Sequence, residues 1–157
     1  MDSIIRYLEG IQKKLTAQTL MVQVVGKDRS LLNLIVTLNT EDQLFKKGED
    51  ALGNEITPEY TPFTVELKQA KGQPTDRVTL KDTGDFYKSF LAHVDNSGDI
   101  IISADPIKID EQTGLETNLT IKYGREIIGL NQHSLDILNE KIILPAQKYI
   151  KEKIFKV

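Results

Sequence analysis

A carboxylate, a hydroxyl and a glycine stand together in the middle of the chain, as Asp82, Thr83 and Gly84. A carboxylate that shares a single proton with a second carboxylate can act as general acid and general base in hydrolysis. The tripeptide occurs once in the sequence, so a second copy of the chain would have to supply the second carboxylate. The first chemical hypothesis is therefore hydrolysis at the interface of a dimer.

The tripeptide resembles the catalytic motif of the aspartic proteases. Two apolar residues and a glycine, Ile127, Ile128 and Gly129, precede the last expected helix, as they do in retroviral-type proteases. This resemblance implies a dimeric retroviral-type aspartic protease that uses Asp82. A simpler role for the same residues is a turn or helix cap, in which Asp and Thr bond nearby backbone N–H groups and Gly adopts an unusual φ.

The neighbours of Asp82 favour the turn. Lys81 and Asp85 put two further charges beside it, whereas a proton-sharing aspartate needs a buried loop between apolar strands. Only scattered single glycines lie between the motif and residue 127, where a protease needs a glycine-rich flap. We therefore expect a turn at this position, with Phe86 directed into the core.

Other residue types that carry chemistry form no recognisable set. His93 and His133 have no partners at the spacing of a catalytic triad, and the chain contains no cysteine. The carboxylates of Asp105, Asp110 and Glu111 do not follow the spacing of a calcium-binding loop. We expect no enzyme, and hence no catalytic residue, no cofactor and no metal site.

Length and composition are those of one ordinary globular domain. The chain has 157 residues, 39% of them hydrophobic and 27% charged, with a formal net charge of -3. This charge disfavours a strongly basic nucleic-acid binder. The first residues lack the apolar stretch of a signal peptide, and no apolar run is long enough to span a membrane. We expect a single domain over residues 1–157 and no membrane contact.

The start of the chain predicts an amphipathic helix over residues 3–16. Its apolar side chains recur at helical spacing: Ile4, Leu8, Ile11 and Leu15. We expect residues 1–20 to contain a docking helix, because long amphipathic termini are commonly ordered only on assembly. The stretch from Leu20 to Val25 is ambiguous between a short strand and the start of a buried helix.

Two more helices are expected before the motif. The first is capped by Asp28 or Ser30 and runs to Gly48, a plausible residue for a helix end. The second begins at Thr61 and Pro62, because Thr is a good N-cap and Pro a good first residue. The apolar residues of this second helix share one face: Phe63, Leu67 and Ala70.

The next part of the chain has the signals of β-structure. Residues 88–95 and 99–104 predict two strands, and residues 96–98 are a hairpin signal between them. Residues 105–114 contain a proline and several carboxylates and predict a loop. Residues 118–123 alternate apolar and polar side chains and predict a third strand.

A long helix is expected at the end of the chain. It begins near Asn131, a good N-cap, and Pro145 inside it should kink or split it. Residues 146–157 form a basic C-terminal tail, with four lysines and one glutamate. The expected fold is therefore α+β: N-terminal helices, a small antiparallel β-sheet and a long C-terminal helix.

Several short motifs follow one another in a set order between about residues 45 and 145. In chain order they are Gly53–Ile56, Thr61–Lys68, Thr83-Gly84 with Phe86 and Ser89, Tyr123–Arg125, and Ile128-Gly129-Leu130. Together they resemble the phage virion morphogenesis family, the tail-completion or head–tail joining proteins of tailed phages. The sequence departs from the family pattern at Ile56, near which the family has an aromatic residue, and at Phe86, where it has leucine.

This resemblance implies a structural virion protein without catalysis. Proteins of this kind form a ring in the head–tail connector, or neck, or complete the tail; they assemble in the host cytoplasm and stay in the virion. The implied partners are further copies of the chain, about six or twelve in a closed ring, together with the portal and other connector or tail proteins. The implied assembly residues are Thr83, Gly84, Phe86, Ser89, Ile128, Gly129 and Leu130.

Charged groups leave further alternatives open. The basic residues Lys68, Lys71 and Arg77 could contact packaged DNA non-specifically, or face solvent or a partner protein. Acidic residues between Asp105 and Glu116 could pair with the basic tail of a neighbouring copy, or simply be solvated. A small soluble binding module that forms no ring is the alternative outside both the protease and the virion classes.

Overall fold

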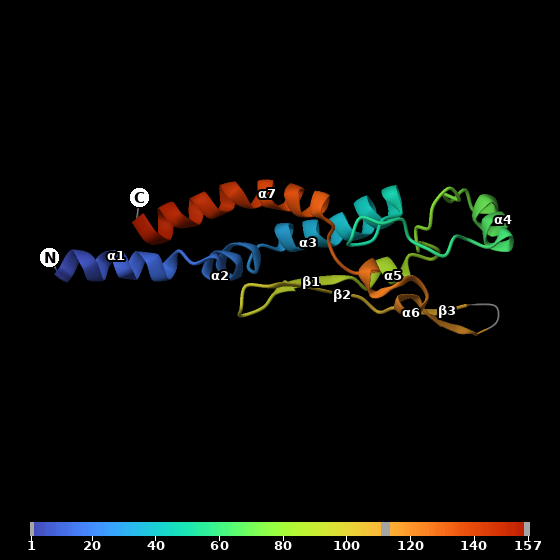
Figure 1. The fold of residues 1–157 in the computed structure, drawn as a ribbon, viewed down its shortest axis with the longest axis horizontal. Helices are drawn as coiled ribbons and strands as arrows, with labels where there is room; N and C mark the ends of the chain where they lie inside the picture. The colour runs from blue at the N-terminus through green and yellow to red at the C-terminus, as the bar shows by residue number, and fades with distance from the viewer. Residues whose placement is uncertain (1, 111–113, 156–157) are drawn as a thin grey trace. The chain divides into compact units, whose positions relative to one another are not determined.

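A computed structural model of the chain describes residues 2–110 and 114–155. The fold mixes helices with two small antiparallel sheets and ends in a long helix, as the sequence predicts (Figure 1). The chain divides into two compact units: unit 1 holds residues 1–34, 92–101 and 137–157, and unit 2 holds residues 35–91 and 102–136. That the whole chain is one domain stays a prediction.

The expected N-terminal helix is confirmed as α1 (Asp2–Lys14). It is followed by a short helix α2 (Ala17–Leu20) and by η1 (Met21–Val25), which has π-helical geometry. Thr16 caps α2, because its hydroxyl accepts a hydrogen bond from the N–H of Thr19 at 3.1 Å. The ambiguous stretch before residue 26 is therefore helical.

The second expected helix is also confirmed. It consists of α3 (Arg29–Thr37) and η2 (Leu38–Lys47), whose turns are wider and of π type. The carboxylate of Asp28 accepts hydrogen bonds from the first turn, including the N–H of Ser30 at 2.8 Å, so Asp28 is the cap. Gly48 ends the helix with a left-handed φ of 66°.

Helix α4 (Pro62–Ala70) begins as predicted, since Thr61 accepts a hydrogen bond from the third residue of the helix. Its apolar face is exposed to solvent: Phe63 is 69% and Leu67 46% accessible. The buried residue of α4 is Lys68, at 7%. A lysine can occupy this position because its ammonium group has protein partners there, which are described below.

The predicted hairpin is confirmed by a two-stranded sheet of β1 (Leu91–Val94) and β2 (Ile100–Ser103). Asp95 fixes its turn, because the carboxylate accepts hydrogen bonds from the N–H groups of Ser97 and Asp99, both at 2.9 Å.

Two predictions for the following segment are wrong. The loop expected over residues 105–114 contains β3 (Ile107–Ile109), which pairs antiparallel with β4 (Glu116–Asn118) in a second sheet. The strand expected over residues 118–123 is largely the helix α6 (Leu119–Tyr123). The side chain of Asn118 starts that helix by accepting two hydrogen bonds from its first N–H groups, which outweighs the alternating pattern.

The last elements are the short helix η3 (Arg125–Ile127), α7 (Gln132–Ile150) and η4 (Lys151–Phe155). Asn131 caps α7 as predicted, accepting a hydrogen bond from the N–H of Ser134 at 3.0 Å. The helix runs continuously through Pro145, so of the two alternatives a split is wrong, and a kink stays a prediction. The basic tail is helical up to residue 155, and residues 156–157 lie outside the described residues.

Unit 2 has a well-defined hydrophobic core. It joins η2 to the segments on both sides of the small sheets. Its buried members are Leu44, Ile56, Val78, Phe86, Tyr87, Phe90, Leu119 and Ile127. Two of the segments that meet here, residues 78–90 and 127–131, contain the two motifs around Thr83-Gly84 and Gly129.

Candidate functional site

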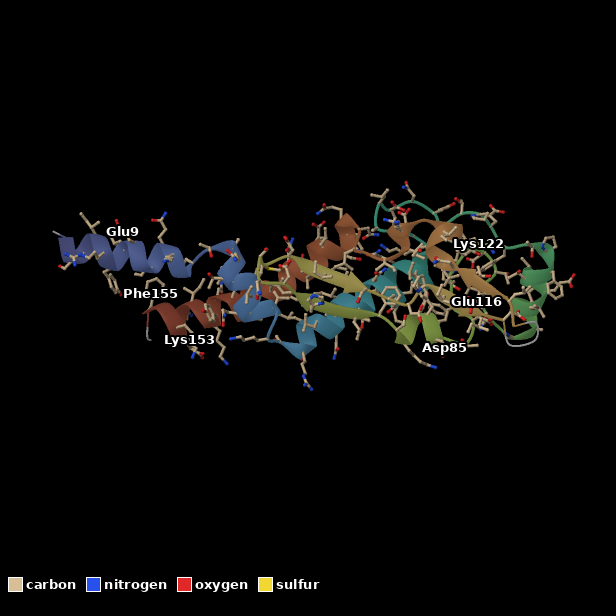
Figure 2. All side chains as sticks on the ribbon, turned by 90° about the horizontal axis from the view of Figure 1, so that it is seen from below. Glu9, Asp85, Glu116, Lys122, Lys153 and Phe155 are labelled. Atoms are coloured by element: carbon tan, nitrogen blue, oxygen red, sulfur yellow. The ribbon has the colours of Figure 1, made fainter. Side chains whose placement is uncertain are left out.

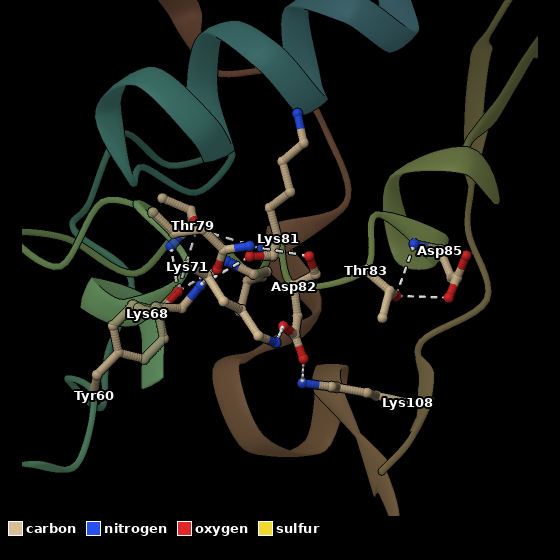
Figure 3. A network of polar contacts seen from close by, with 11 residues as sticks. Tyr60, Lys68, Lys71, Thr79, Lys81, Asp82, Thr83, Asp85 and Lys108 are labelled. Carbon is tan, nitrogen blue, oxygen red and sulfur yellow. Dashed lines mark hydrogen bonds and ion pairs between the residues drawn. The ribbon is translucent and has the colours of Figure 1, made fainter. Parts of the chain in front are cut away.

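The carboxylate of Asp82 is held by two lysines of the same unit. Its Oδ1 lies 2.6 Å from the Nζ of Lys71, and its Oδ2 lies 2.8 Å from the Nζ of Lys108 (Figure 3). The hydrogen bonds from Lys108 and Lys71 lower the pKa of Asp82 to about 2. The group is therefore ionised across the mildly acidic range in which a proton-sharing pair of aspartates works.

The next two residues of the motif start a helix. Gly84 has a φ of 90° and precedes the short helix α5 (Asp85–Lys88). The hydroxyl of Thr83 donates a hydrogen bond to Oδ2 of Asp85 at 2.6 Å (Figure 3). That bond, together with Lys88, keeps the pKa of Asp85 below its usual range. The turn expected at this position is confirmed.

The last residues of the motif connect α5 with the core and with the chain before β3. Phe86 is buried and meets Phe90 edge to face, with ring centroids 5.0 Å apart. The hydroxyl of Ser89 donates to the carbonyl of Phe86 at 2.6 Å and accepts from the N–H of Asp105 at 3.0 Å. Ser89 therefore ties two chain segments together with both of its hydrogen-bonding functions.

The segment that leads to Asp82 is fixed by two tyrosine hydroxyls. The hydroxyl of Tyr60 accepts from the N–H of Thr79 at 2.8 Å and from that of Leu80 at 3.3 Å, while the hydroxyl of Tyr87 donates to the carbonyl of Thr79. Burial raises the pKa of the Tyr87 hydroxyl, so this donor keeps its proton. Leu80 has a left-handed φ of 56°, a costly conformation that the surrounding bonds stabilise.

Two lysine side chains, one of them buried, add to this network. The buried Nζ of Lys68 donates to Gln73 Oε1 at 3.0 Å and to the carbonyl of Lys81 at 2.8 Å, and lies 4.9 Å from the ring centroid of Tyr60. The Nζ of Lys81 lies 3.0 Å from Glu41 Oε1. These contacts explain why α4 packs through a lysine (Figure 3).

The three basic residues considered for DNA contact are thus engaged within unit 2. Lys68 and Lys71 belong to the network around Asp82, and Arg77 donates to Asp76 at 2.7 Å and to the carbonyl of Phe45 at 2.9 Å. A groove for nucleic acid needs cations that reach the phosphate backbone. Contact with DNA stays a prediction, and these three residues add little to it.

Two buried amides, Asn39 and Gln43, form hydrogen bonds with the backbone of the second motif segment. They lie one turn apart on η2. Asn39 donates to the carbonyl of Ile127 at 3.2 Å and accepts from the N–H of Gly129 at 2.8 Å. Gln43 donates to the carbonyl of Gly129 at 2.9 Å and accepts from the N–H of Asn131 at 2.9 Å. We call this pair the amide clamp; it satisfies four backbone groups of the segment that links residue 127 to the start of the last long helix and has no strand partner.

The clamp also sets where α7 begins. Asn131, held through its backbone by Gln43, donates from its side chain to Glu49 at 3.2 Å and caps the helix. Gly129 has a φ of 150°, and an added Cβ would stand 3.0 Å from the Cβ of Ala51. Ile128 packs against the core and Leu130 is half-buried. These three motif residues therefore serve to seat the chain.

Sequence reasoning missed the amide clamp and the tyrosines. One signal for the clamp was present: the two amides stand four residues apart on one helix face, and Asn39 follows the apolar Ile35 and Val36 at helical spacing. Tyr60 and Tyr87 gave no local signal, because the groups they bond lie elsewhere in the sequence.

The other candidate residues do not add a reactive site. His93 on β1 and His133 in the first turn of α7 are both exposed. Of the carboxylates weighed for a cation, Asp105 and Asp110 are exposed, and Glu111 lies outside the described residues. Among residues 2–110 and 114–155, no group of three potential metal ligands comes together, and no helix is long and apolar enough to cross a membrane.

A polar cavity of about 220 Å³ lies in unit 2, beside the segment that the tyrosines hold. Its lining includes Lys47, Ile56, Tyr60 and Arg77. Arg77 is already paired with Asp76.

No protein family, curated protein or solved structure matches this chain.

Proposed function

We propose that the chain is a structural virion protein of a tailed phage, which forms a ring in the head–tail connector or completes the tail. The observation that carries this proposal is that the residues of both motifs hold the fold of unit 2 together. The polar groups of Thr83 and Ser89 are bonded within unit 2, and residues 128–130 are seated on the amide clamp. Motif residues that maintain a shape suit an assembly component better than an enzyme.

The main alternative, a dimeric aspartic protease, fits this geometry poorly. The dyad of such an enzyme requires a carboxylate that keeps or shares a proton near pH 5, which calls for a raised pKa. The two lysines that bind Asp82 act in the opposite direction and bring its pKa to about 2. We propose accordingly that the protein is not an enzyme.

Measuring the mass of the purified protein by size exclusion with light scattering tests the proposal. A ring should appear as a closed oligomer of about six or twelve copies, alone or on addition of a portal protein from the same genome. The mass should not depend on protein concentration well above the dissociation constant, because a closed ring has no free interface to extend.

The Asp82→Asn variant separates the two functions. If the protein assembles, this variant should still reach the wild-type mass, because Asp82 is a partly exposed ion-pair residue. If the protein is a protease, the wild type should be a dimer that cleaves peptides at acidic pH, and Asp82→Asn should lose that cleavage. Cleavage of this kind would refute the assembly proposal.

A further inference from the structure

Unit 1 leaves more large apolar side chains exposed than it buries. Among the residues described in this unit, four are buried: Val24, Val25, Leu31 and Leu138. Eight are exposed: Ile4, Ile5, Tyr7, Leu8, Ile101, Ile143, Leu144 and Phe155. Single exposed apolar residues are ordinary on a protein surface, but groups of them mark interaction surfaces. Two such groups lie on helices, one on α1 and one on the C-terminal half of α7 with η4.

The group on α1 has the geometry of a helix-packing stripe. Ile4, Leu8, Ile11 and Leu15 follow one another at steps of four, three and four residues, the spacing of a coiled-coil seam. Ile4 is 63% and Leu8 57% accessible, and all of residues 3–10 are exposed, whereas Ile11 and Leu15 are half-buried. A helix of this length is marginal in water by itself. The stripe therefore calls for a partner, and its spacing calls for a helical one.

The group on α7 offers a second, different surface. Ile143 and Leu144 are exposed on successive positions, and Phe155 is exposed on η4. Leu144 and Lys148 stand four residues apart and so lie on one face of the helix. On α1, Glu9, which is labelled in Figure 2, stands four residues before Lys13 and shares its face, away from the stripe. The Nζ of Lys148 lies 3.9 Å from Oε1 of Glu152, so the match between the two surfaces rests on their apolar residues.

We propose that α1 docks on α7 of a second copy of this chain, with Leu8 and its stripe against Ile143 and Leu144. This inference rests on the proposed ring and names the surfaces that would close it. Two different surfaces on each copy give a head-to-tail contact, which is the kind that generates rings.

The available area is sufficient for such a contact. Four exposed residues of α1 and three of α7 and η4 offer roughly 100 Å² of apolar surface each, or roughly 700 Å² in total. Apolar atoms make up a little over half of an ordinary interface, so this area belongs to a contact of roughly 1,200 Å², the lower end for stable complexes. Membrane-surface helices instead carry a polar face rich in basic residues, whereas Glu9 interrupts that of α1.

Two single variants of the full chain, Leu8→Glu and Leu144→Glu, test the docking by light scattering. Each places a charge in the proposed contact, and both positions are exposed, so the wild-type circular dichroism spectrum should be kept. Association should weaken at least about tenfold in each. Lys13→Gln is the matched control, because it changes the net charge by the same amount on the opposite side of α1. It should associate like the wild type.

Mixing the two variants identifies the geometry. Leu144→Glu keeps an intact α1 and Leu8→Glu keeps an intact α7, so an equimolar mixture should form a one-to-one complex that neither variant forms alone. If Leu144→Glu associates like the wild type while Leu8→Glu does not, two α1 helices pair with each other and the proposal is overturned. A monomeric wild type that binds vesicles of phosphatidylcholine and phosphatidylserine, together with a Leu8→Glu variant that does not bind them, would overturn the proposal in favour of a membrane.

The same measurements separate this inference from the proposed function. A wild-type ring that persists in Leu8→Glu and in Leu144→Glu refutes the docking and leaves the ring in place. If the mixed variants form the one-to-one complex while the wild type forms open chains without a defined mass, the docking is supported and the closed ring is refuted. A wild type that stays monomeric at every concentration, with and without a portal protein, refutes both.

Discussion

Replacing Gln43 by leucine is the most direct test of the amide clamp. Gln43 is 1% exposed, and its amide pairs the carbonyl of Gly129 with one atom and the N–H of Asn131 with the other. Leucine has a similar volume, so the variant leaves little empty space. It does leave a backbone N–H and a backbone C=O without partners in a buried place. Each unpaired group costs about 1–3 kcal/mol, so Gln43→Leu should lower the free energy of unfolding by about 2–6 kcal/mol.

Urea unfolding followed by far-UV circular dichroism measures this loss. A domain has roughly 5–15 kcal/mol of stability to lose, so the midpoint should move far to lower urea. Gln69→Leu on α4 is the matched control, because it makes the same chemical change at an exposed helical position. That variant should stay within about 0.5 kcal/mol of the wild type.

A loss below about 1 kcal/mol in Gln43→Leu would refute the reasoning, since the two backbone groups would then have found other partners. A double-mutant cycle with Asn39→Ala adds a second check. Both amides hold the same segment around Gly129, so releasing it with one substitution should reduce what the other can still remove. The two losses should therefore add to more than the loss in the double variant.

Three further substitutions probe the other contacts of unit 2. Tyr60→Phe removes the acceptor of two backbone N–H groups and should cost about 1–3 kcal/mol in urea unfolding. Gly129→Ala should lower the melting temperature more than Gly53→Ala, because both glycines have positive φ but only at residue 129 does an added Cβ meet a neighbour, at 3.0 Å. Asp82→Asn should cost roughly 1 kcal/mol near neutral pH, a figure reduced for the exposure of both lysine partners, and less at high salt. The folded-state pKa of Asp82 is lowered, so its contribution is complete above the unfolded-state pKa of about 4 and is lost as the pH falls to about 2. The difference between wild type and Asp82→Asn should disappear over that interval.

The parts of the fold that the sequence predicted correctly depend on neighbouring residues. Asp28, Thr61 and Asn131 each cap a helix whose first N–H groups follow within three residues. The hairpin is likewise set by a short turn signal at residues 96–98. Such signals can be read from one sequence because cause and effect lie in the same short stretch.

The parts that the sequence could not predict depend on distant partners. The amide clamp joins residues that are 86 to 90 positions apart. Lys68 is buried although charged side chains usually face solvent, because Tyr60, Gln73 and the carbonyl of Lys81 surround its ammonium group. The error at residues 119–123 has a different cause: five residues are too few to distinguish helical from alternating spacing, and Asn118 decides between them.

The motif residues and the α1 stripe should fail in different ways if the protein forms a ring. Ser89 uses its hydroxyl to join the carbonyl of Phe86 to the N–H of Asp105, so Ser89→Ala should lower the free energy of unfolding by about 1–3 kcal/mol. It should weaken assembly only under conditions in which the unfolded fraction rises, because both hydrogen bonds of the Ser89 hydroxyl are made within unit 2. Leu8→Glu should weaken assembly at unchanged stability, since Leu8 is 57% accessible in the single chain. Urea midpoints and oligomer masses measured on both variants show whether each residue stabilises the fold or contacts the neighbouring subunit. If Ser89→Ala keeps the wild-type midpoint and still loses the oligomer, the motif contacts the neighbouring subunit directly, and the scaffold role assigned to it here is wrong.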